Sequence, residues 1–193
     1  MNGDGDEVDA LTERDQARWA AARTALDDLM RGLAAGTIDD AGVTAYTRQL
    51  AQLNLDLEQV RDSLHLPSDA GSYREALIAI LLRIPERWGR WVSCDAGWYP
   101  LLAALDAGLA ALDPDYVLHQ AKEKFATLRY YAHTENDAVR AEFDALIAEA
   151  ERRSATICER CGAEGSLSTG PQYGRIKTLC PSCRAVLGYE AKA

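Results

Sequence analysis

Two pairs of cysteines near the end of the chain are the residues best suited to chemistry. Cys158 and Cys161 form one Cys-x2-Cys pair, Cys180 and Cys183 form a second, and eighteen residues separate the pairs. Each short spacing places two sulfur atoms on one side of a tight turn, and four thiolates complete the tetrahedral shell that zinc prefers in structural sites. The sequence therefore predicts one structural Zn²⁺ held by these four residues.

The residues around the two pairs indicate how such a site is built. Gly162 follows the first pair, where a tight turn must aim its amides at sulfur, and Pro181 lies inside the second pair, where it suits the start of a helix. We predict a zinc ribbon or treble-clef module over residues 156–190, which is too small to fold without a metal. An iron–sulfur cluster is the alternative occupant, because four thiolates also hold one.

No other residues form a recognisable catalytic arrangement in the sequence. Cys94 has no meaningful spacing from the scattered histidines, and we expect it to be a small buried thiol. Because sulfur fills all four positions around the predicted zinc, no open position is left for water or substrate. We therefore expect no catalytic residues and no enzymatic activity.

A second candidate site lies in the part of the chain richest in aromatic residues. Here charged residues alternate with large rings, and such a surface can hold a phosphate or the carboxylate of a partner. The alternative is a solvated turn between two strands, with the rings in the core. The candidate partner-binding residues of this region are Trp98, Lys122, Glu123, Lys124 and Arg129.

The first third of the chain shows the hydrophobic spacing of two helices. Residues 11–66 predict an antiparallel helical hairpin, with Gly36 ending the first helix and Asp39 or Asp40 suited to the start of the second. Apolar residues at alternating steps of three and four over residues 43–64 predict a stripe of the coiled-coil type. Either the stripe packs within the chain or it contacts a partner or a second copy, in which case the candidate contacts are Leu50, Leu53 and Leu57.

The middle of the chain, residues 72–155, has the pattern of an α+β domain. Apolar faces at helical spacing alternate with two short strands, 116–121 and 127–132, joined by a turn over residues 122–126. The predicted fold class is therefore α+β and mainly helical. Its parts are the N-terminal hairpin, central helices with a small antiparallel sheet, and the zinc module.

Charge is distributed unevenly along the chain. The formal net charge is −9, and residues 1–70 account for −8 of it, with 14 acidic and 6 basic side chains. This balance makes direct nucleic-acid binding unexpected and favours a basic protein partner for the N-terminal third. Residues 1–10 predict an acidic disordered tail that does not fit a secretory signal, and no apolar stretch is long enough to span a membrane. We expect a cytoplasmic protein.

Residues 72–190 resemble a group of bacterial and phage proteins that have no assigned activity. The resemblance implies a central domain that ends in a zinc ribbon or treble clef. Those proteins commonly have glycine where this chain has Ala126, which disfavours a tight turn with positive φ at that position. The matching segments are Trp88-Gly89-Arg90-Trp91, Gly97-Trp98-Tyr99-Pro100-Leu101, Gln120-Ala121-Lys122-Glu123-Lys124-Phe125 with Leu128-Arg129-Tyr130-Tyr131, and the two cysteine pairs.

The chain is also similar to the DksA/TraR-type regulators of RNA polymerase. They combine a helical hairpin that has acidic residues at its tip, here Asp39 and Asp40, with a four-cysteine zinc module. In those regulators the hairpin leads directly into the zinc module, whereas residues 66–157 intervene here. The main hypothesis is a zinc-stabilised adaptor that binds a protein partner. The alternatives are a regulator that contacts RNA polymerase and an acidic inhibitor or immunity-type protein that binds a basic toxin or enzyme. A nuclease or other zinc enzyme is a third alternative, for which the sequence offers no histidine or carboxylate motif near an open metal.

Overall fold

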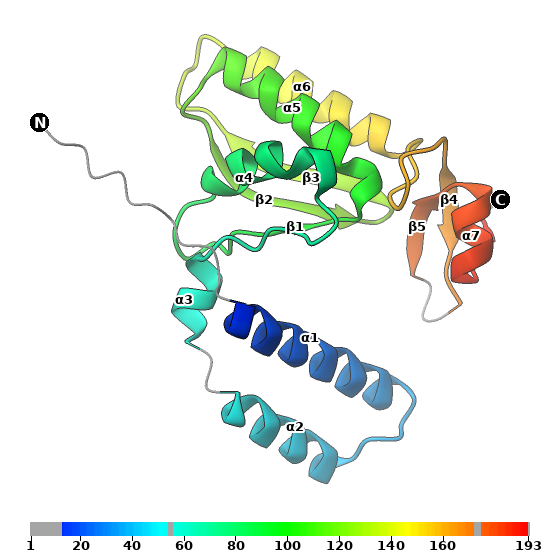
Figure 1. Ribbon diagram of the computed structural model, residues 1–193. Helices are drawn as coiled ribbons and strands as arrows, with labels where there is room; N and C mark the ends of the chain where they lie inside the picture. Colours follow the sequence, from blue (N-terminus) through cyan, green and yellow to red (C-terminus); the bar gives the residue numbers. More distant parts are fainter. Residues whose placement is uncertain (1–12, 54–55, 172–174, 193) are drawn as a thin grey trace, which may run out of the picture. The chain divides into compact units, whose positions relative to one another are not determined.

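The computed structural model of the protein describes residues 13–53, 56–171 and 175–192. The chain divides into two units, residues 1–63 and residues 64–193 (Figure 1). The described part of the first unit contains helices, and the second unit contains helices and two small sheets. The α+β class predicted from the sequence is confirmed. The predicted acidic tail, residues 1–10, lies outside the described residues.

The first unit contains two helices in contact, followed by a short third helix. The connection after the first helix turns at Gly36, whose φ is +65°. Asp39 then caps the next helix, because its carboxylate accepts a hydrogen bond from the Gly42 amide at 3.0 Å. The helices are α1 (Glu13–Ala34), α2 (Asp40–Gln52) and α3 (Leu57–Asp62).

The second predicted helix is interrupted, which corrects the expected continuous stripe over residues 43–64. Helix α2 ends at Gln52, and α3 begins at Leu57. Asp56 caps α3 by accepting hydrogen bonds from the amides of Glu58 and Gln59 at 3.0 and 3.1 Å. A side chain that binds amides in this way starts a new helix, which hydrophobic spacing alone does not reveal. Leu50 and Leu57 therefore belong to different helices.

A three-stranded sheet forms the centre of the second unit. The strand order is β1-β2-β3, with β1 parallel to β2 and β2 antiparallel to β3. A bulge lies between Leu118 and Gln120 of β2. Both long strands extend further than the sequence predicted, so Lys122, Glu123 and Lys124 belong to β2 and not to the turn. The strands are β1 (Val92–Ser93), β2 (Val117–Lys124) and β3 (Thr127–His133).

The turn between β2 and β3 consists of Phe125 and Ala126. Both residues have positive φ, +55° and +64°. Positive φ at both central positions is the backbone of a type I′ hairpin turn, whose twist matches the twist of the flanking strands. The expectation that Ala126 disfavours a turn with positive φ is therefore wrong, because the turn forms without a glycine at this position.

Three helices cover one face of this sheet and enclose the core. Helix α4 contacts α5, α5 contacts α6, and α6 contacts β3, and Figure 1 shows α5 and α6 side by side above the strands. Leu102, Leu118, Leu128 and Phe143 are fully buried between these layers. Edge strand β3 is protected by α6, because Ser154 and Glu151 accept hydrogen bonds from edge amides of β3. The helices are α4 (Arg74–Leu82), α5 (Tyr99–Leu112) and α6 (Arg140–Ser154), with short 3₁₀ turns at Gly71–Tyr73 and Ala96–Trp98.

The cysteine-rich end of the chain forms a second small sheet and a helix. The strand order is β5-β4-β6, and both pairings are antiparallel. A short helix follows β5 directly and carries the second cysteine pair. The elements are β4 (Ser166–Thr169), β5 (Ile176–Leu179), α7 (Pro181–Leu187) and β6 (Glu190–Ala191). Within the ranges that the structure describes, every helix is too short or too polar to cross a membrane.

Candidate metal centre and partner-binding face

The four cysteines of the two pairs meet at one point. Their sulfur atoms all lie within 4.8 Å of one another, and the Sγ atoms of Cys161 and Cys180 are 3.6 Å apart. Sulfur atoms around a tetrahedral zinc are about 3.8 Å apart, given metal–sulfur bonds of about 2.3 Å, whereas a disulfide bond is about 2.05 Å long. All four cysteines are free. The predicted ligand set can hold a metal ion.

The first cysteine pair lies on a tight turn that follows α6. The Gly162 amide donates to the Cys158 carbonyl at 2.8 Å, and the Cys158 amide donates to the Ala163 carbonyl at 2.7 Å. Gly162 has a φ of +79°, a conformation that costs a residue with a Cβ about 1–2 kcal/mol. The glycine after the first pair is therefore needed for the turn. Cys158 is buried and Cys161 is exposed.

The second cysteine pair begins α7. Cys180 is the N-cap residue, and its sulfur accepts a hydrogen bond from the Cys183 amide at 3.4 Å. Pro181 occupies the first turn, where the absence of an amide hydrogen costs nothing. The hydrogen bond from the Cys183 amide lowers the pKa of Cys180 to about 7, whereas burial raises the pKa of Cys183 to about 12. Within this pair the protein groups therefore favour the thiolate at Cys180 only.

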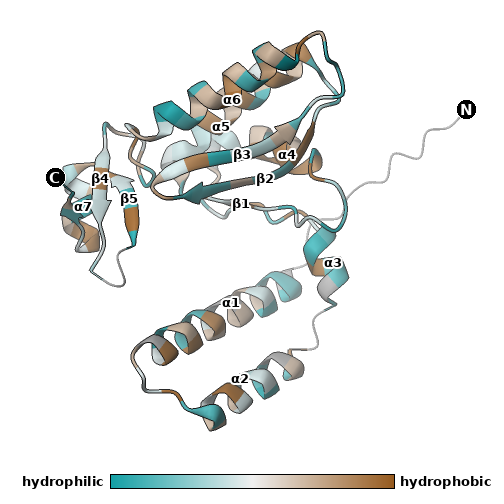
Figure 2. Ribbon diagram, turned by 180° about the vertical axis from the view of Figure 1, so that it is seen from behind, coloured by the Kyte–Doolittle hydropathy of each residue, from teal (hydrophilic) through white to brown (hydrophobic). Residues whose placement is uncertain are grey.

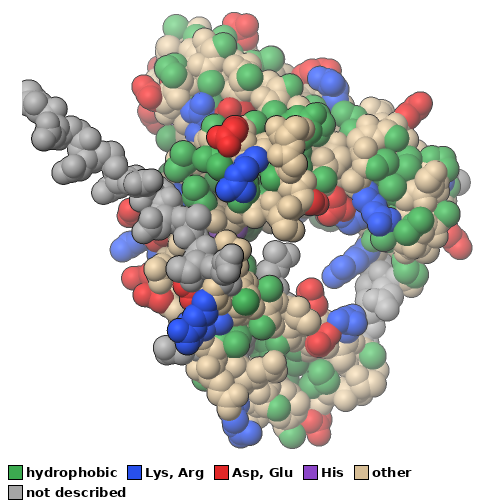
Figure 3. Space-filling view, viewed as in Figure 1, with side chains coloured by type: hydrophobic (Ala, Val, Ile, Leu, Met, Phe, Trp, Pro, Cys, Tyr) green, Lys and Arg blue, Asp and Glu red, His purple; other side chains and the backbone are tan. Residues whose placement is uncertain are grey.

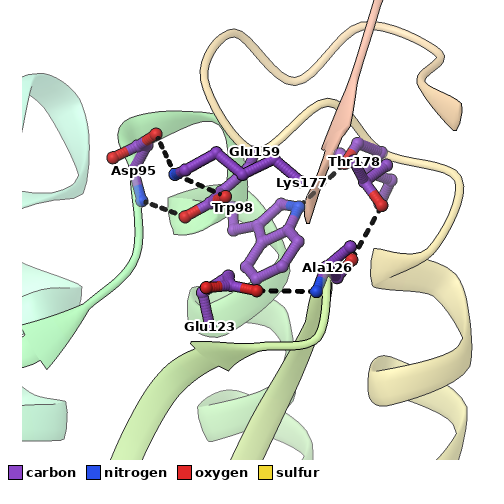
Figure 4. A network of polar contacts seen from close by, with 8 residues as sticks. Asp95, Trp98, Glu123, Ala126, Glu159, Lys177 and Thr178 are labelled. Carbon is purple, nitrogen blue, oxygen red and sulfur yellow. Dashed lines mark hydrogen bonds and ion pairs between the residues drawn. The ribbon is translucent and has the colours of Figure 1, made fainter. Parts of the chain in front are cut away.

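A partly buried ion cluster connects the cysteine turn to the central domain (Figure 4). Glu159 lies between the first two cysteines and is 1% exposed. Its carboxylate is 2.7 Å from Lys177 Nζ, and Lys177 also reaches Asp95 at 2.9 Å. Burial lowers the pKa of Lys177, but its hydrogen bonds to Glu159 and Asp95 outweigh this effect and the net shift is upward. The lysine therefore stays charged and neutralises the buried carboxylate.

The backbone of the cysteine turn packs directly on Gly97. A Cβ added to Gly97 would lie 2.2 Å from the Cys158 carbonyl oxygen, 2.5 Å from that of Glu159 and 2.5 Å from the Gly162 nitrogen. These are backbone atoms, which cannot move aside as the end of a side chain can. Gly97 is therefore required for the close approach of the two chain segments.

Trp98, one of the predicted partner-binding residues, is a core residue that supports the cysteine turn. Its side chain is fully buried, and its indole nitrogen donates to the Ile157 carbonyl at 2.8 Å. The structure therefore assigns Trp98 to the core and not to a partner-binding surface. The prediction grouped Trp98 with Lys122 because this part of the chain is rich in aromatic and charged residues. Composition of this kind does not show whether a ring points into the core or toward solvent.

The tip of the β2–β3 hairpin is also attached to the cysteine module (Figure 4). Thr178 Oγ1 donates to the Ala126 carbonyl at 2.7 Å, and the Ala126 amide donates to Glu123 Oε1 at 2.6 Å. The Glu123 carboxylate therefore stabilises the turn. This role agrees with the alternative that the region is a turn between two strands and not a partner-binding site. Ala126 itself is 1% exposed.

The cationic candidates lie on the face of the sheet that α4, α5 and α6 do not cover. Lys122 pairs directly with Arg129, and Lys124 pairs with Thr127, so these side chains share one face. Leu118 and Leu128, by contrast, are buried in the core on the other face. The structure thus separates the predicted cluster: Lys122, Lys124 and Arg129 lie on the outer face, and Trp98 lies in the core.

Four aromatic residues of this outer face were not among the predicted partner-binding residues. Tyr131 pairs with Gln120 in the register of the outer face, and His133 follows it two positions later. His119 stacks on His133 with ring centroids 5.1 Å apart, and the Trp88 ring lies 4.3 Å from His119. The alternation of Arg129, Tyr131 and His133 was the available signal. The bulge that turns His119 to the same face was not visible in the sequence.

Cys94 and the histidines do not form a nucleophile with a base in the described structure. Burial raises the pKa of the Cys94 thiol, so the group stays protonated, as expected for a buried structural cysteine. The ring of His65 packs edge-on against Trp91 at 5.5 Å. Burial and the neighbouring His133 lower the pKa of His119.

The predicted contact residues of the N-terminal unit fall at a break between helices. Leu53 is half-buried just after α2; the side chains of Leu50 and Leu57 lie outside the described part of the structure. A different apolar row is exposed on α1, made by Leu26, Met30 and Leu33 at 45, 58 and 44% exposure. We call these three residues the α1 stripe.

Comparisons of the chain with models of known protein families, with curated proteins and with solved structures found no match.

Proposed function

We propose that the four cysteines hold one structural Zn²⁺ in a treble-clef arrangement. In support, a cysteine turn is followed by the β4–β5 hairpin and then by α7, whose first turn supplies Cys180 and Cys183. A ribbon would take its second pair from another turn between strands. Four sulfur ligands favour zinc over the oxygen-preferring Mg²⁺ and Ca²⁺.

We propose that the protein is an adaptor without catalytic activity. Sulfur occupies every position around the proposed zinc, which leaves no site for a reacting water. Apart from the four cysteines, no cluster of three or more potential metal ligands occurs among the residues that the structure describes. The buried pairs around Glu159 and Lys177 serve to join chain segments.

The proposed contact with a protein partner is made by the N-terminal unit, with α1 and α2 as an antiparallel hairpin. The α1 stripe is the observation that carries this proposal. Its residues, 26, 30 and 33, follow helical spacing, so they share one face of α1, next to the face on which Ala22, Ala25 and Leu29 are buried. Hydrophobic side chains at the surface of these helices are visible in Figure 3.

Charge suggests the chemistry of this partner. Residues 1–63 contain 13 acidic and 6 basic side chains, a formal charge of −7, whereas residues 64–193 contain 17 and 15, a charge of −2. An apolar row on a strongly acidic unit fits a partner that presents an apolar patch within a basic surface. A basic toxin or enzyme, as in an inhibitor-type complex, has this chemistry.

The test is affinity purification of the tagged chain from its native host. Glu substitutions at Leu26 and Met30 should abolish recovery of the partner, and high salt should weaken the wild-type complex. Ala45→Glu with Gln49→Glu is the matched control, since it adds the same two charges at the same spacing on exposed positions of α2. The proposal fails if the stripe variant is folded and recovers the same proteins as the control.

A further inference from the structure

The outer face of the central sheet is cationic at the end next to the β2–β3 turn. Reading across the ladder, Gln120 faces Tyr131, Lys122 faces Arg129, and Lys124 faces Thr127. No acidic residue occupies these six positions, and Figure 2 shows the hydrophilic end of β2 that carries the lysines. Like charges placed directly opposite each other, as at Lys122 and Arg129, destabilise a sheet. Glu151 of α6 offsets part of the charge of Arg129 from 3.8 Å, but Lys122 and Lys124 have no carboxylate partner within the described residues. The two lysines therefore suit a ligand that supplies negative charge.

The two lysines of this face lie over aromatic rings. Lys122 Nζ is 5.5 Å from the centroid of the Tyr131 ring, and Lys124 Nζ is 5.4 Å from that of Phe125. Neither ammonium forms an ion pair with a carboxylate among the residues described in the structure. A phosphate can therefore bind both ammonium groups, and no internal ion pair has to be broken first.

Exposed rings accompany these cations. Trp88 is 56% exposed, Tyr131 44% and Phe125 69%, and the stacked rings of His119 and His133 continue the row from Trp88 across the sheet. Phe125 has a φ of +55°, which a bulky residue adopts only at a cost in stability. A large exposed ring in a strained turn contributes little to folding, so it is better explained by contact with a ligand.

We propose that this outer sheet face, formed by Lys122, Lys124, Arg129 and Tyr131 with Phe125 and Trp88 beside them, binds single-stranded nucleic acid. Cations bind the phosphates, and the rings stack on unpaired bases, as on other sheet platforms for single strands. An acidic polypeptide would use the cations but would leave the flat rings without a matching surface. The negative charge of the chain does not oppose this binding as strongly as its total implies, because residues 1–63 carry −7 of the −9.

The proposal predicts both the salt dependence and the affected residues. With two phosphates neutralised by Lys122 and Lys124 on a single strand, the logarithm of the binding constant should fall with the logarithm of salt concentration at a slope of about −1.4. The probe is a short fluorescein-labelled oligouridylate, titrated with the full metal-loaded chain and followed by fluorescence anisotropy.

Lys122→Gln with Lys124→Gln should weaken binding at least tenfold and make the slope shallower, because two phosphate contacts are lost. The variant should stay folded, since these two lysines form no ion pair within the described residues. Tyr131→Ser should weaken binding by about tenfold through lost stacking, with less change in slope.

Controls separate this site from the rest of the molecule. Arg152→Gln removes an exposed cation that pairs with Glu149 on α6, and it should leave binding unchanged. Leu26→Glu with Met30→Glu should also bind the oligonucleotide as wild type does, so that failure of the α1 stripe and failure of this face are distinguishable. Each variant must keep its metal content and its thermal midpoint.

Three results would overturn the proposal. The first is an affinity that Lys122→Gln with Lys124→Gln does not change. The second is equal binding of duplex RNA, which would rule out base stacking. The third is displacement of the oligonucleotide by polyglutamate at equal charge concentration, which would assign the face to an acidic polypeptide.

Discussion

The indole nitrogen of Trp98 donates a hydrogen bond to the carbonyl of Ile157 over 2.8 Å. Trp98 lies in the core of the central domain, and Ile157 immediately precedes the first cysteine of the candidate metal centre. Together with the contacts of Gly97 and Thr178, this bond makes the cysteine turn a continuation of the core. Metal binding and folding of the central domain should therefore be linked.

Removal of the metal should destabilise residues 64–193 as a whole. Ligand binding to the folded state alone adds about 4 kcal/mol when the metal is at a thousandfold excess over its Kd. We expect a chelator to lower the thermal midpoint of the central domain and to alter the fluorescence of Trp98. Cys161→Ser should have the same effect, whereas Cys94→Ser should keep the metal. An unchanged unfolding transition of the metal-free chain would show that the two parts fold independently.

Gly97→Ala should be among the most harmful single-methyl changes in the chain. The new Cβ would lie 2.2 Å from the Cys158 carbonyl oxygen, so the cysteine turn must move. We expect a loss of about 3 kcal/mol in the free energy of unfolding and a lower metal affinity, measured by urea denaturation and competition with a chelator. Gly108→Ala is the matched control in α5, where the added Cβ meets Leu146 at 3.4 Å. It should be neutral or stabilise by up to about 1 kcal/mol, because alanine favours the helix. Equal losses in both variants would contradict the proposed close packing.

Lys177→Met should leave a buried negative charge without its partner. Glu159 is 1% exposed and 2.7 Å from the lysine, and breaking such a pair costs about 3–5 kcal/mol. Adding Glu159→Gln should recover a large part of this loss, since the neutral amide no longer needs the cation. The comparison is Arg152→Met, which removes one member of the exposed Arg152–Glu149 pair and should cost less than about 1 kcal/mol. Urea denaturation of the wild type, Lys177→Met, Glu159→Gln and the double variant gives the coupling energy, and additive losses at positions 177 and 159 would refute the coupling.

Phe125→Asn should stabilise the protein. Phe125 is 69% exposed, so its substitution removes little buried surface. Its φ of +55° is unfavourable for phenylalanine, whereas asparagine adopts positive φ in type I′ turns at lower cost. We expect a gain of about 0.5–1 kcal/mol in thermal or urea denaturation. The same variant should bind the oligouridylate more weakly, because a stacking ring is lost. A decrease in stability would show instead that the ring packs in the folded protein.

The candidate metal centre was predictable from the sequence because its chemistry depends on local spacing. Cys158 with Cys161, and Cys180 with Cys183, each place two sulfurs in one turn, and four thiolates in two such pairs match the ligand set of a structural zinc site. The outer sheet face was only partly predictable. Lys122 and Arg129 were identified as candidates, but their direct pairing depends on the register between β2 and β3, and His119 reaches the same face only through a bulge.

The sequence by itself determined the four candidate ligands, the α+β class and the uneven charge. These properties follow from residue type and from spacings of a few positions along the chain. Only the tertiary structure decided that Trp98 is buried under the cysteine turn, that Glu123 accepts a hydrogen bond from the hairpin turn, and that Lys122 and Lys124 on either side of Glu123 face outward. Those outcomes depend on how segments far apart in the chain pack and satisfy buried polar groups, and periodicity within one segment does not contain that information.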